Sequence, residues 1–580
     1  MDLKQQLDDL RKFVWEEREA NYAKLTEIWD KPLSQKLESG ESQRISNITV
    51  EDKHHLLVTL GGGESRFREG DMLCLHLGNV PHTSFVRQAS IEAEQEGEWL
   101  LYVFDLDPDA VTTISEPCFA DPDSMDQRHF FEKAFDDLAS TPIGTDVVLP
   151  LLAGRLDASY IYPDNYDKAA DIAEERGLND SQIDAVGKGV AAQYLSCIQG
   201  PPGTGKTKVI SLIAKLLAEE GHAILITSHT HMAINNALNK VAKEGVTTAK
   251  VGALSGTKGL DATIPRCDYA IDWEDKPDNG YVIGATPFAT CSERLESFEF
   301  DTIIFDEASQ ITVPLAVMAM RKGKRFVFVG DHKQLPPVVL SKSVLDGESY
   351  SVFSRLVLGN SSTAAMLKQT YRMNSDLSHW PSQQYYNGNL VAVGENANRQ
   401  FMLPTRPQRH MACLSSSHSL VFIKSPGINA RTSSASEAEL VVDIIANAVE
   451  AGMPLENVGV VTPFRNHGKN IKGVLADKFG MNTAKTVVTD TVERMQGQER
   501  EMIILSLCST DVQFISAVAS FFFQAERLNV AITRAMTKLV IIGPELSATF
   551  SVDSNEQLLL EGIEAYRSLV NAAYYHSIGE

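Results

Sequence analysis

Residues 199–209 read QGPPGTGKTKV, and this glycine-rich stretch decides the fold class. It follows the apolar run YLSCI and precedes the apolar run ISLIAKLLA, which predicts a buried strand, a loop and a helix in that order. The segment fits the pattern GxxxxGK[ST], in which glycines let backbone N–H groups approach a phosphate and the helix N-terminus adds positive charge. We therefore expect a binding site for a nucleoside triphosphate, and this strand, loop and helix context disfavours a glycine turn without a ligand.

The side chains of this loop have distinct expected roles. Lys206 would reach the β- and γ-phosphates, and the hydroxyl of Thr207 would ligate Mg²⁺. The residues expected to bind nucleotide are Gly200, Pro201, Pro202, Gly203, Thr204, Gly205, Lys206 and Thr207.

Two carboxylates end a later strand of β-branched residues, in Phe305-Asp306-Glu307-Ala308. Asp306 would hold Mg²⁺ directly or through water, and Glu307 would orient and deprotonate the attacking water. An acidic pair alone is more often a solvated strand end, so this prediction depends on the phosphate loop. After the next strand, Gln334 in GDHKQLPP would contact the γ-phosphate or its water as a sensor; the alternative is a loop-stabilising glutamine.

Charge that develops on the γ-phosphoryl group needs cations beyond those of the loop. Arg372 in QTYRMN and Arg534 in RLNVAITRA are the candidates, although the default role of an arginine is a weak surface ion pair. If both reach the nucleotide from a second domain, binding would join the two domains and hydrolysis would release them.

The length of the chain predicts several domains, because 580 residues are more than a single hydrophobic core usually accommodates. Two regions alternate buried apolar strands with helical segments, which indicates two doubly wound parallel sheets and an α/β fold class. Before them, helical spacing predicts one long N-terminal helix that ends at Pro32, and short alternating runs predict a small β-barrel up to about residue 125. We divide the chain into 1–38 (stalk helix), 39–126 (barrel), 127–176 (returning helix and linker), 177–356, 357–550 and 551–580 (helical tail).

Composition limits the function classes. The formal net charge of −23 argues against a broad basic surface. A polyanion such as nucleic acid must therefore bind in a narrow groove rather than on a broad basic face. Seven widely spaced cysteines suggest neither disulfides nor structural zinc, and the charged start MDLKQQLDDLRK lacks the apolar run of a signal peptide. We expect a cytoplasmic protein, or a nuclear one in a eukaryote. We also expect it to be a monomer that does not associate with a membrane.

GPPGTGKT, DEASQ, GDHKQLPP, YRMN, QGQERE and RLNVAITRA follow one another in an order that resembles superfamily 1B helicases, and their Upf-like branch above all. The resemblance covers about residues 177–545 and implies two RecA-like domains, with ATP and Mg²⁺ as cofactors. By this resemblance Gln182 would read the adenine edge and Tyr371 would stack on its ring. Gln496, Gly497 and Glu499 would line the ribose and γ-phosphate side.

The same resemblance implies a track for single-stranded DNA or RNA across both domains, and prolines after GDHKQL imply movement from 5′ to 3′. The track would consist of Ser228, His229, Thr230, Thr286, Pro336, Pro337, Thr462, Arg465 and Thr491. Short hydroxyl and backbone donors suit sugar-phosphate contacts that ignore base identity. The first hypothesis is an ATP-dependent helicase or translocase. The alternatives are a nucleotide-gated clamp or ribonucleoprotein remodeller that does not unwind, and, less well supported, an AAA-type ATPase that acts on protein.

Overall fold

The computed structural model describes most of the chain. Residues outside the description are 1–2, 63–64, 69, 79–85, 96, 104, 107–110, 112–116, 342–349, 360, 496, 548–549, 553–555 and 578–580. In the part that it describes, no helix is both long enough and apolar enough to cross a membrane.

The N-terminal region is a helical stalk. Helix α1 (Leu3–Trp29) packs along α4 (Arg128–Ser140), and Arg11 joins them through ion pairs with Glu132 and Asp136 at 2.9 and 2.8 Å. One long helix up to Pro32 was expected, but α1 ends at Trp29 and a short helix, α2 (Leu33–Ser39), follows Pro32. Proline suits the residue just before a new helix because it lacks a backbone N–H.

A closed six-stranded antiparallel barrel lies between the two stalk helices in sequence, as the alternating pattern predicts. Its strand order is β1-β2-β5-β4-β3-β6, with Trp99 fully buried at its centre. A buried ion pair between Lys36 of α2 and Asp121 of β6 fixes α2 to the barrel. The strands are β1 (Gln43–Val50), β2 (His55–Leu60), β3 (Met72–His76), β4 (Val86–Gln95), β5 (Glu98–Val103) and β6 (Cys118–Pro122).

The first α/β domain contains an eight-stranded parallel sheet in the order β10-β9-β11-β8-β12-β13-β7-β14. Its strands are β7 (Leu195–Gln199), β8 (Ala223–Thr227), β9 (Thr247–Val251), β10 (Arg266–Cys267), β11 (Tyr281–Gly284), β12 (Phe300–Phe305), β13 (Gly323–Gly330) and β14 (Ala364–Met366). The last strand, β14, lies beyond residue 356, where we expected this domain to end. It pairs with β7, so the first sheet takes one strand from the start of the following segment.

Both faces of this sheet are buried, which explains why its strands are apolar throughout. One face packs on the stalk, with Leu10 and Phe13 of α1 in the same cluster as Phe305 and Phe328. The other face packs on helices α7 (Asp180–Ala191), α8 (Lys206–Glu219) and α9 (His231–Lys243). The barrel is therefore carried by the first α/β domain through the stalk.

The second α/β domain contains a six-stranded parallel sheet in the order β19-β18-β20-β21-β17-β22. Its strands are β17 (Leu420–Lys424), β18 (Val458–Thr462), β19 (Val488–Thr491), β20 (Arg500–Ser506), β21 (Ala535–Gly543) and β22 (Tyr574–Tyr575). Its larger helices are α13 (Ser375–Tyr386), α15 (Ala435–Glu450), α16 (Arg465–Phe479), α20 (Ala525–Ile532) and α21 (Gln557–Ala572). The predicted α/β class with two doubly wound parallel sheets, a stalk and a barrel is confirmed.

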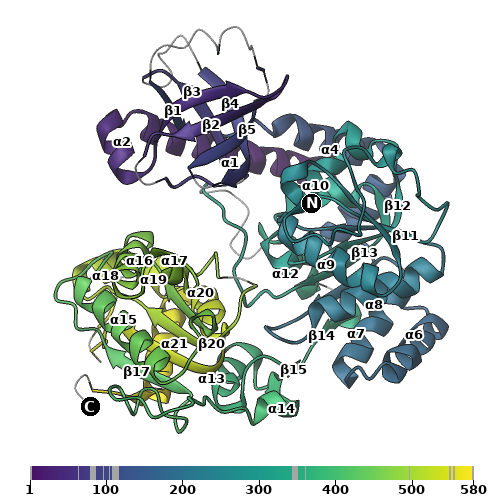
Figure 1. Ribbon diagram of the computed structural model, residues 1–580. Coiled ribbons are helices and arrows are strands. Elements are labelled where there is room, and N and C mark those ends of the chain that lie inside the picture. The colour runs from purple at the N-terminus through teal and green to yellow at the C-terminus, as the bar shows by residue number, and fades with distance from the viewer. Residues whose placement is uncertain are drawn as a thin grey trace.

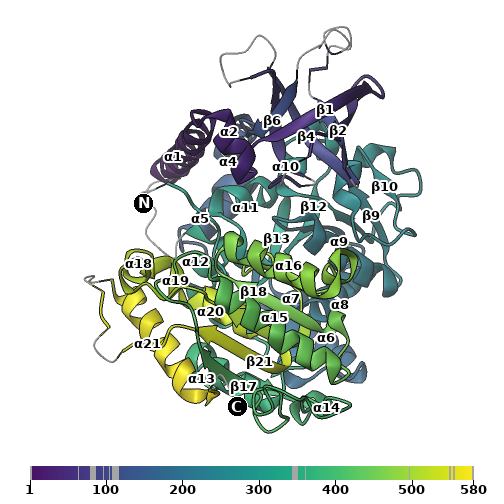
Figure 2. The same cartoon turned by 60° about the vertical axis from the view of Figure 1, so that its left-hand side comes forward.

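Figure 1 shows the barrel above the two α/β domains, and Figure 2 shows the same order after rotation. The helix α16 lies on the side of the second domain that faces the barrel, in both views. The carboxyl ends of β7, β8 and β12 lead directly into the residues of the nucleotide site described below.

Candidate functional site

The predicted phosphate loop opens into a cleft between the two α/β domains, with about 1150 Å³ of space when the solvent at its open side is included. Its walls come from the loop after β7, the ends of β8 and β12, the start of α9, and the second domain. The lining residues are Pro201, Gly203, Thr204, Gly205, Lys206, Thr207, His229, Thr230, Met232, Ala233, Asn236, Asp306, Glu307, Gln310, Arg372, Glu493 and Gly497.

Two glycines shape the phosphate loop. Gly203 and Gly205 have φ values of 74° and 85°, a left-handed region that favours glycine. Lys206 is the first residue of α8, and its Nζ donates a hydrogen bond to the carbonyl oxygen of Gly200 at 2.9 Å. A Cβ atom on Gly200 would lie 2.2 Å from Cγ of Lys206, so only glycine leaves room for the lysine to fold over the loop.

The connection between the two domains runs over this loop. Thr370 Oγ1 donates to the carbonyl oxygen of Pro202 at 2.9 Å, and the backbone N–H of Tyr371 donates to that of Gly203 at 2.9 Å. A Cβ on Gly203 would lie 2.5 Å from Cβ of Arg372. The segment 370–372 therefore packs directly on the phosphate loop, which sequence spacing could not show.

Asp306 and Glu307 lie at the end of β12, at the cavity wall. Burial, and next the neighbouring charge of Glu307, raises the pKa of Asp306 to about 7. Glu307 has a φ of 50°, an uncommon left-handed conformation for this residue type, and such strain concentrates at functional sites. A Cβ on Gly330 would lie 2.8 Å from the backbone nitrogen of Ser309, so β13 approaches this turn closely.

The two candidate arginines differ in their placement. Arg372 lines the cavity, and its Nε donates to Glu499 Oε2 at 2.5 Å while Nη1 donates to the carbonyl oxygen of Thr533 at 3.1 Å. Arg534 is only 2 % exposed and is not among the lining residues. Its Nε donates to the carbonyl oxygen of Val530, and burial beside Arg372 lowers its pKa to about 9. Arg534 thus lies behind Arg372 in this conformation.

Gln334 does not line the cavity, which differs from the expected place beside the γ-phosphate. Its amide nitrogen donates to Asp331 Oδ2 at 2.9 Å, and the hydroxyl of Tyr386, in the second domain, donates to the same oxygen at 2.7 Å. Asn529 in turn donates to the hydroxyl oxygen of Tyr386 at 2.8 Å. Gln334 is therefore part of a polar network that joins the two domains, because Asp331 offers a buried charged acceptor.

Gln182 and Tyr371 meet at Asn179, the N-cap of α7. Gln182 is the third residue of α7 and forms a capping box with Asn179, and its amide nitrogen donates to the carbonyl oxygen of Thr204 at 3.0 Å. Asn179 also donates to the hydroxyl of Tyr371, whose side chain is 42 % exposed. The glutamine amide already has protein partners, whereas the tyrosine presents an open aromatic face. Gln496 lies outside the described residues.

The cavity also contains residues that sequence reasoning missed or assigned elsewhere. His229 and Thr230, expected on the strand track, line it together with Lys206. Gln310 lies beside His229, whose pKa burial lowers, and the DEASQ motif contains this glutamine. Met232, Asn236 and Glu493 also line the cavity. The sequence did not predict them there because they belong to no phosphate-binding motif.

The remaining track residues fall into two groups. On the first domain, Ser228 is buried, Thr286 is half-buried at the start of α10 (Pro287–Thr290), and Pro336 is exposed beside Pro337. On the second domain, Thr462, Arg465 and Thr491 line another cavity, which also includes residues of the barrel.

Two family models match the chain, and both are described as an AAA domain. One covers residues 177–264 and 278–342, and the other covers residues 348–546.

Curated relatives match about two thirds of the chain. The DNA replication ATP-dependent helicase/nuclease dna2 of Schizosaccharomyces pombe is 27 % identical over 406 residues, which is 63 % of this chain and 28 % of that protein. The human protein of the same printed name is 28 % identical over 431 residues, which is 67 % of this chain and 39 % of that protein. The chain thus spans less than half the length of these relatives.

Among solved structures, the helicase nonstructural protein 10 of an arterivirus aligns with 92 % of this chain and 82 % of that chain. The TM-score is 0.39 at 14 % identity, which is a loose likeness.

Proposed function

Because the chain belongs to the Upf-like branch of the superfamily 1B helicases, we propose that it is an ATP-hydrolysing motor on a nucleic-acid strand. One observation carries this proposal: Lys206 and Glu307 of the first domain line one cavity with Arg372 of the second. A triphosphate in that cavity would contact both domains, so its hydrolysis would change how strongly they hold each other.

The phosphate loop would bind the triphosphate. Lys206 would leave the carbonyl oxygen of Gly200 for the β- and γ-phosphates, and the backbone N–H groups at the start of α8 would complete the cradle. The exposed face of Tyr371 would take the adenine ring, with Gln182 beside it. Gly497 lines the cavity, and Glu499, which holds Arg372, would complete its second-domain side.

The donor set fits Mg²⁺. Thr207 and Asp306 both line the cavity, and Mg²⁺ takes one or two protein oxygens together with substrate phosphates and waters. Among the described residues no group of three or more His, Cys, Asp or Glu side chains could hold a metal without such help. When bound, the ion would neutralise charge on the phosphates.

The chain's own residues would then carry out hydrolysis. Glu307 would orient and deprotonate the attacking water, and Arg372 would stabilise the charge on the γ-phosphoryl group after releasing Glu499. Arg534, directly behind it, would reach the nucleotide only after the second domain has moved. Gln334 would report the nucleotide state through Asp331 to Tyr386.

We propose single-stranded nucleic acid as the polymer, followed from 5′ to 3′. The relatives' names contain DNA replication, which favours DNA over RNA. Short hydroxyl side chains of both domains, Ser228, Thr286, Thr462 and Thr491, would contact the backbone without reading bases. The division at residues 38, 126 and 176 also remains part of this proposal, as does action as a monomer inside the cell.

The test combines ATPase and strand-displacement assays. A single-stranded oligonucleotide should raise ATP hydrolysis many-fold, and a duplex with a 5′ overhang should be unwound. A clamp or remodeller would bind the strand in a nucleotide-dependent way without displacing a complementary one. An ATPase that ignores oligonucleotides would contradict the proposal. Parallel titrations with matched DNA and RNA would decide between the two polymers.

A further inference from the structure

Three side chains meet at one corner of the nucleotide cavity, namely those of His229, Glu307 and Gln310. The strands β8 and β12 are parallel neighbours, and Thr227 at the end of one pairs with Phe305 at the end of the other. His229 and Glu307 are each the second residue after these paired ends, so the register of the sheet places them side by side. The ends of two neighbouring strands therefore build this corner.

Gln310 reaches the same corner through a short turn. The 3₁₀ turn Ala308–Gln310 has Glu307 as its N-cap, and the backbone N–H of Gln310 donates to the carbonyl oxygen of Glu307 at 3.1 Å. Side chains three residues apart eclipse each other in such a turn. The side chain of Gln310 therefore lies on the same side of the turn as the carboxylate of Glu307, and both line the cavity.

Two polar atoms of this corner lack a partner. Nδ1 of His229 and Nε2 of Gln310 are buried, and neither has a hydrogen-bond partner in the described part of the chain. Burial of an unpaired polar atom is unfavourable, so such atoms in the wall of a substrate cavity indicate a bound ligand or water. Since both residues line the nucleotide cavity, the missing partner belongs to the reaction that takes place there.

The side chain of His229 is suited to accept a hydrogen bond. Burial lowers its pKa, while Glu307 and Gln310 act in the opposite direction. The lowered pKa keeps the imidazole neutral near pH 7, and a neutral imidazole has one ring nitrogen that accepts and one that donates. Nε2 of Gln310 can only donate. The corner thus offers carboxylate oxygens, a further acceptor and a donor.

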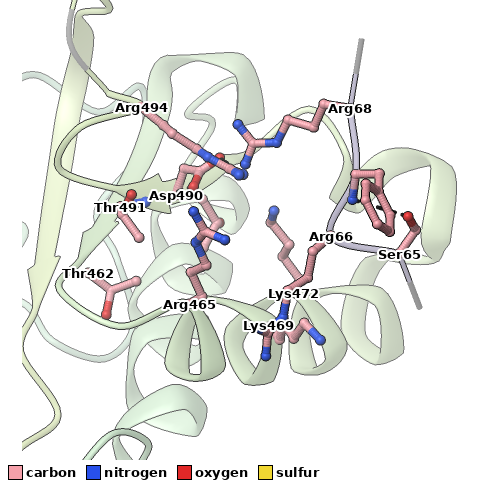
Figure 3. A pocket seen from close by; sticks show the side chains of 13 residues that line it. Ser65, Arg66, Arg68, Thr462, Arg465, Lys469, Lys472, Asp490, Thr491 and Arg494 are labelled. Carbon is pink, nitrogen blue, oxygen red and sulfur yellow. Dashed lines mark hydrogen bonds and ion pairs between the residues drawn. The ribbon is translucent and has the colours of Figure 1, made fainter. Parts of the chain in front are cut away.

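The position of His229 differs from that of the strand track on which it was expected. Thr462, Arg465 and Thr491 of that track line another cavity, between the barrel and the second domain (Figure 3). His229 instead lines the nucleotide cavity together with Lys206. A role for its ring in the reaction therefore uses contacts that these three track residues do not share.

The polar groups of the corner match those that the attacking water needs. A bound water makes about three hydrogen bonds. Glu307 and Nδ1 of His229 would each accept one from the water, and Nε2 of Gln310 would donate one to it. The remaining lone pair of the water would then face the γ-phosphorus. Gln334, which was expected to hold this water or the γ-phosphate, is bonded to Asp331 and does not line the cavity.

We infer that Gln310 and His229 hold the attacking water against Glu307, in the role that sequence spacing assigned to Gln334. This inference rests on the proposed function and adds two residues to its reaction. The oxygen of the water would form a bond to the γ-phosphorus while one of its protons moves to the carboxylate of Glu307. The bond from the γ-phosphorus to the bridging oxygen would break, and its electron pair would leave with ADP.

The test compares two analogues of the nucleotide. ADP with beryllium fluoride imitates bound ATP, whereas ADP with aluminium fluoride imitates the transition state with its water in line. Gln310→Ala and His229→Ala should keep their affinity for the beryllium complex. Both should lose about 10²-fold in affinity for the aluminium complex, because only that complex includes the held water. Titration of a fluorescent ADP in each fluoride measures the two affinities.

Conservative variants identify the atoms that hold the water. Asparagine places Oδ1 where histidine has Nδ1, so His229→Asn should retain most of the activity, whereas His229→Gln should not. Gln310→Glu replaces the donor with an acceptor and should be as impaired as Gln310→Ala. In the impaired variants kcat should fall by about 10²-fold with little change in KM. His379→Asn and Gln400→Ala are matched controls, because both residues are exposed and neither lines the cavity.

The outcomes separate this inference from the proposed function. A wild-type protein that neither hydrolyses ATP nor binds the aluminium complex would contradict the proposed function itself. If wild type does both, equal losses for the two analogues in Gln310→Ala and His229→Ala would show a structural role or a direct phosphate contact, and would overturn only the inference. Variants that match their controls would overturn it as well. So would a Gln334→Ala variant that loses only the aluminium complex beside an unchanged Gln310→Ala, because the role would then return to Gln334.

Discussion

The carboxylate of Glu17, on the N-terminal helix, accepts a hydrogen bond from the backbone N–H of Leu340 at 2.8 Å. It also accepts one from the N–H of Ser341 at 2.9 Å. The stalk therefore holds the segment that follows Gln334, which is itself part of the polar network with Asp331 and Tyr386 that joins the two domains.

Glu17→Ala should loosen this segment. Loss of two charge-assisted but partly exposed hydrogen bonds should cost about 1 kcal/mol locally, so the amides of Leu340 and Ser341 should exchange hydrogen about fivefold faster. Mass spectrometry or NMR of exchanging amides measures this, and Glu19→Ala, one exposed carboxylate further along the same helix, is the control. Unchanged protection in Glu17→Ala would show that other contacts hold the segment.

Glu307→Gln should separate binding from turnover. The amide keeps the size of the side chain but cannot accept a proton, so kcat should fall by about 10²- to 10⁴-fold while nucleotide affinity changes little. Equilibrium binding of a fluorescent ATP analogue and steady-state ATPase assays measure the two quantities. A variant that retains normal turnover would exclude Glu307 as the base.

Arg372→Ala and Arg534→Ala should behave differently. Arg372 faces the cavity, so its loss should reduce kcat by about 10³-fold or more with a small change in melting temperature. Arg534 is buried with backbone partners, so its loss should lower the melting temperature as well as the rate. Differential scanning fluorimetry beside the ATPase assay distinguishes them. Equal destabilisation by both substitutions would contradict the assignment of Arg372 to the cavity wall.

Gly203→Ala should disturb the contact between the phosphate loop and the connecting segment. Its new Cβ would lie 2.5 Å from Cβ of Arg372. Gly245→Ala is the matched control, because Gly245 also has a positive φ of 85° and a Cβ there would meet nothing within 4 Å. Both variants should pay about 1 kcal/mol for the left-handed backbone, but only Gly203→Ala should also lose nucleotide affinity. Equal affinity in the two variants would contradict this close packing.

Lys250 should make stability depend on pH. It lies in β9, its Nζ has no hydrogen-bond partner among the described residues, and burial lowers its pKa to about 7. Between pH 7 and about 10 the unfolded state binds more protons than the folded state at this site. The free energy of unfolding should therefore rise with pH, by at most about 1.4 kcal/mol per unit.

Lys250→Met should remove this dependence and raise the melting temperature at neutral pH, because the buried side chain no longer carries a charge. Melting curves between pH 7 and 10 measure it, with the exposed Lys240→Met on α9 as the control. A pH profile shared by Lys250→Met and wild type would show that the buried amine does not titrate in this range.

Local patterns predicted much of the fold. Apolar strands next to helical segments predicted both parallel sheets, and alternating runs predicted the barrel, because periodicity reflects which faces are buried. The motif GPPGTGKT predicted the loop between β7 and α8, and Asp306 with Glu307 reached the same cavity because carboxyl ends of neighbouring parallel strands meet at one edge.

Contacts between distant segments were beyond such patterns. The short strand β14 joins the first sheet although it lies beyond helix α12 (Val352–Gly359), and nothing in its three residues signals that pairing. Gln334 bonds to Asp331 instead of lining the cavity, because a buried carboxylate close in sequence competes for its amide. The barrel segment that contains Arg68 and the helix α16 are far apart in sequence and lie together only in the folded chain. The local pattern of neither segment therefore predicted the cavity that they share.

The passage of residues 370–372 over the phosphate loop joins the two lobes directly beside the nucleotide site. When the two lobes rotate about that crossing, atoms near it move least and atoms far from it sweep the longest arcs. A fraction of an ångström gained or lost beside the γ-phosphate would then become a larger displacement at the outer rim of the second lobe. Rotation of the two lobes alone would produce this amplification, without movement of a further domain.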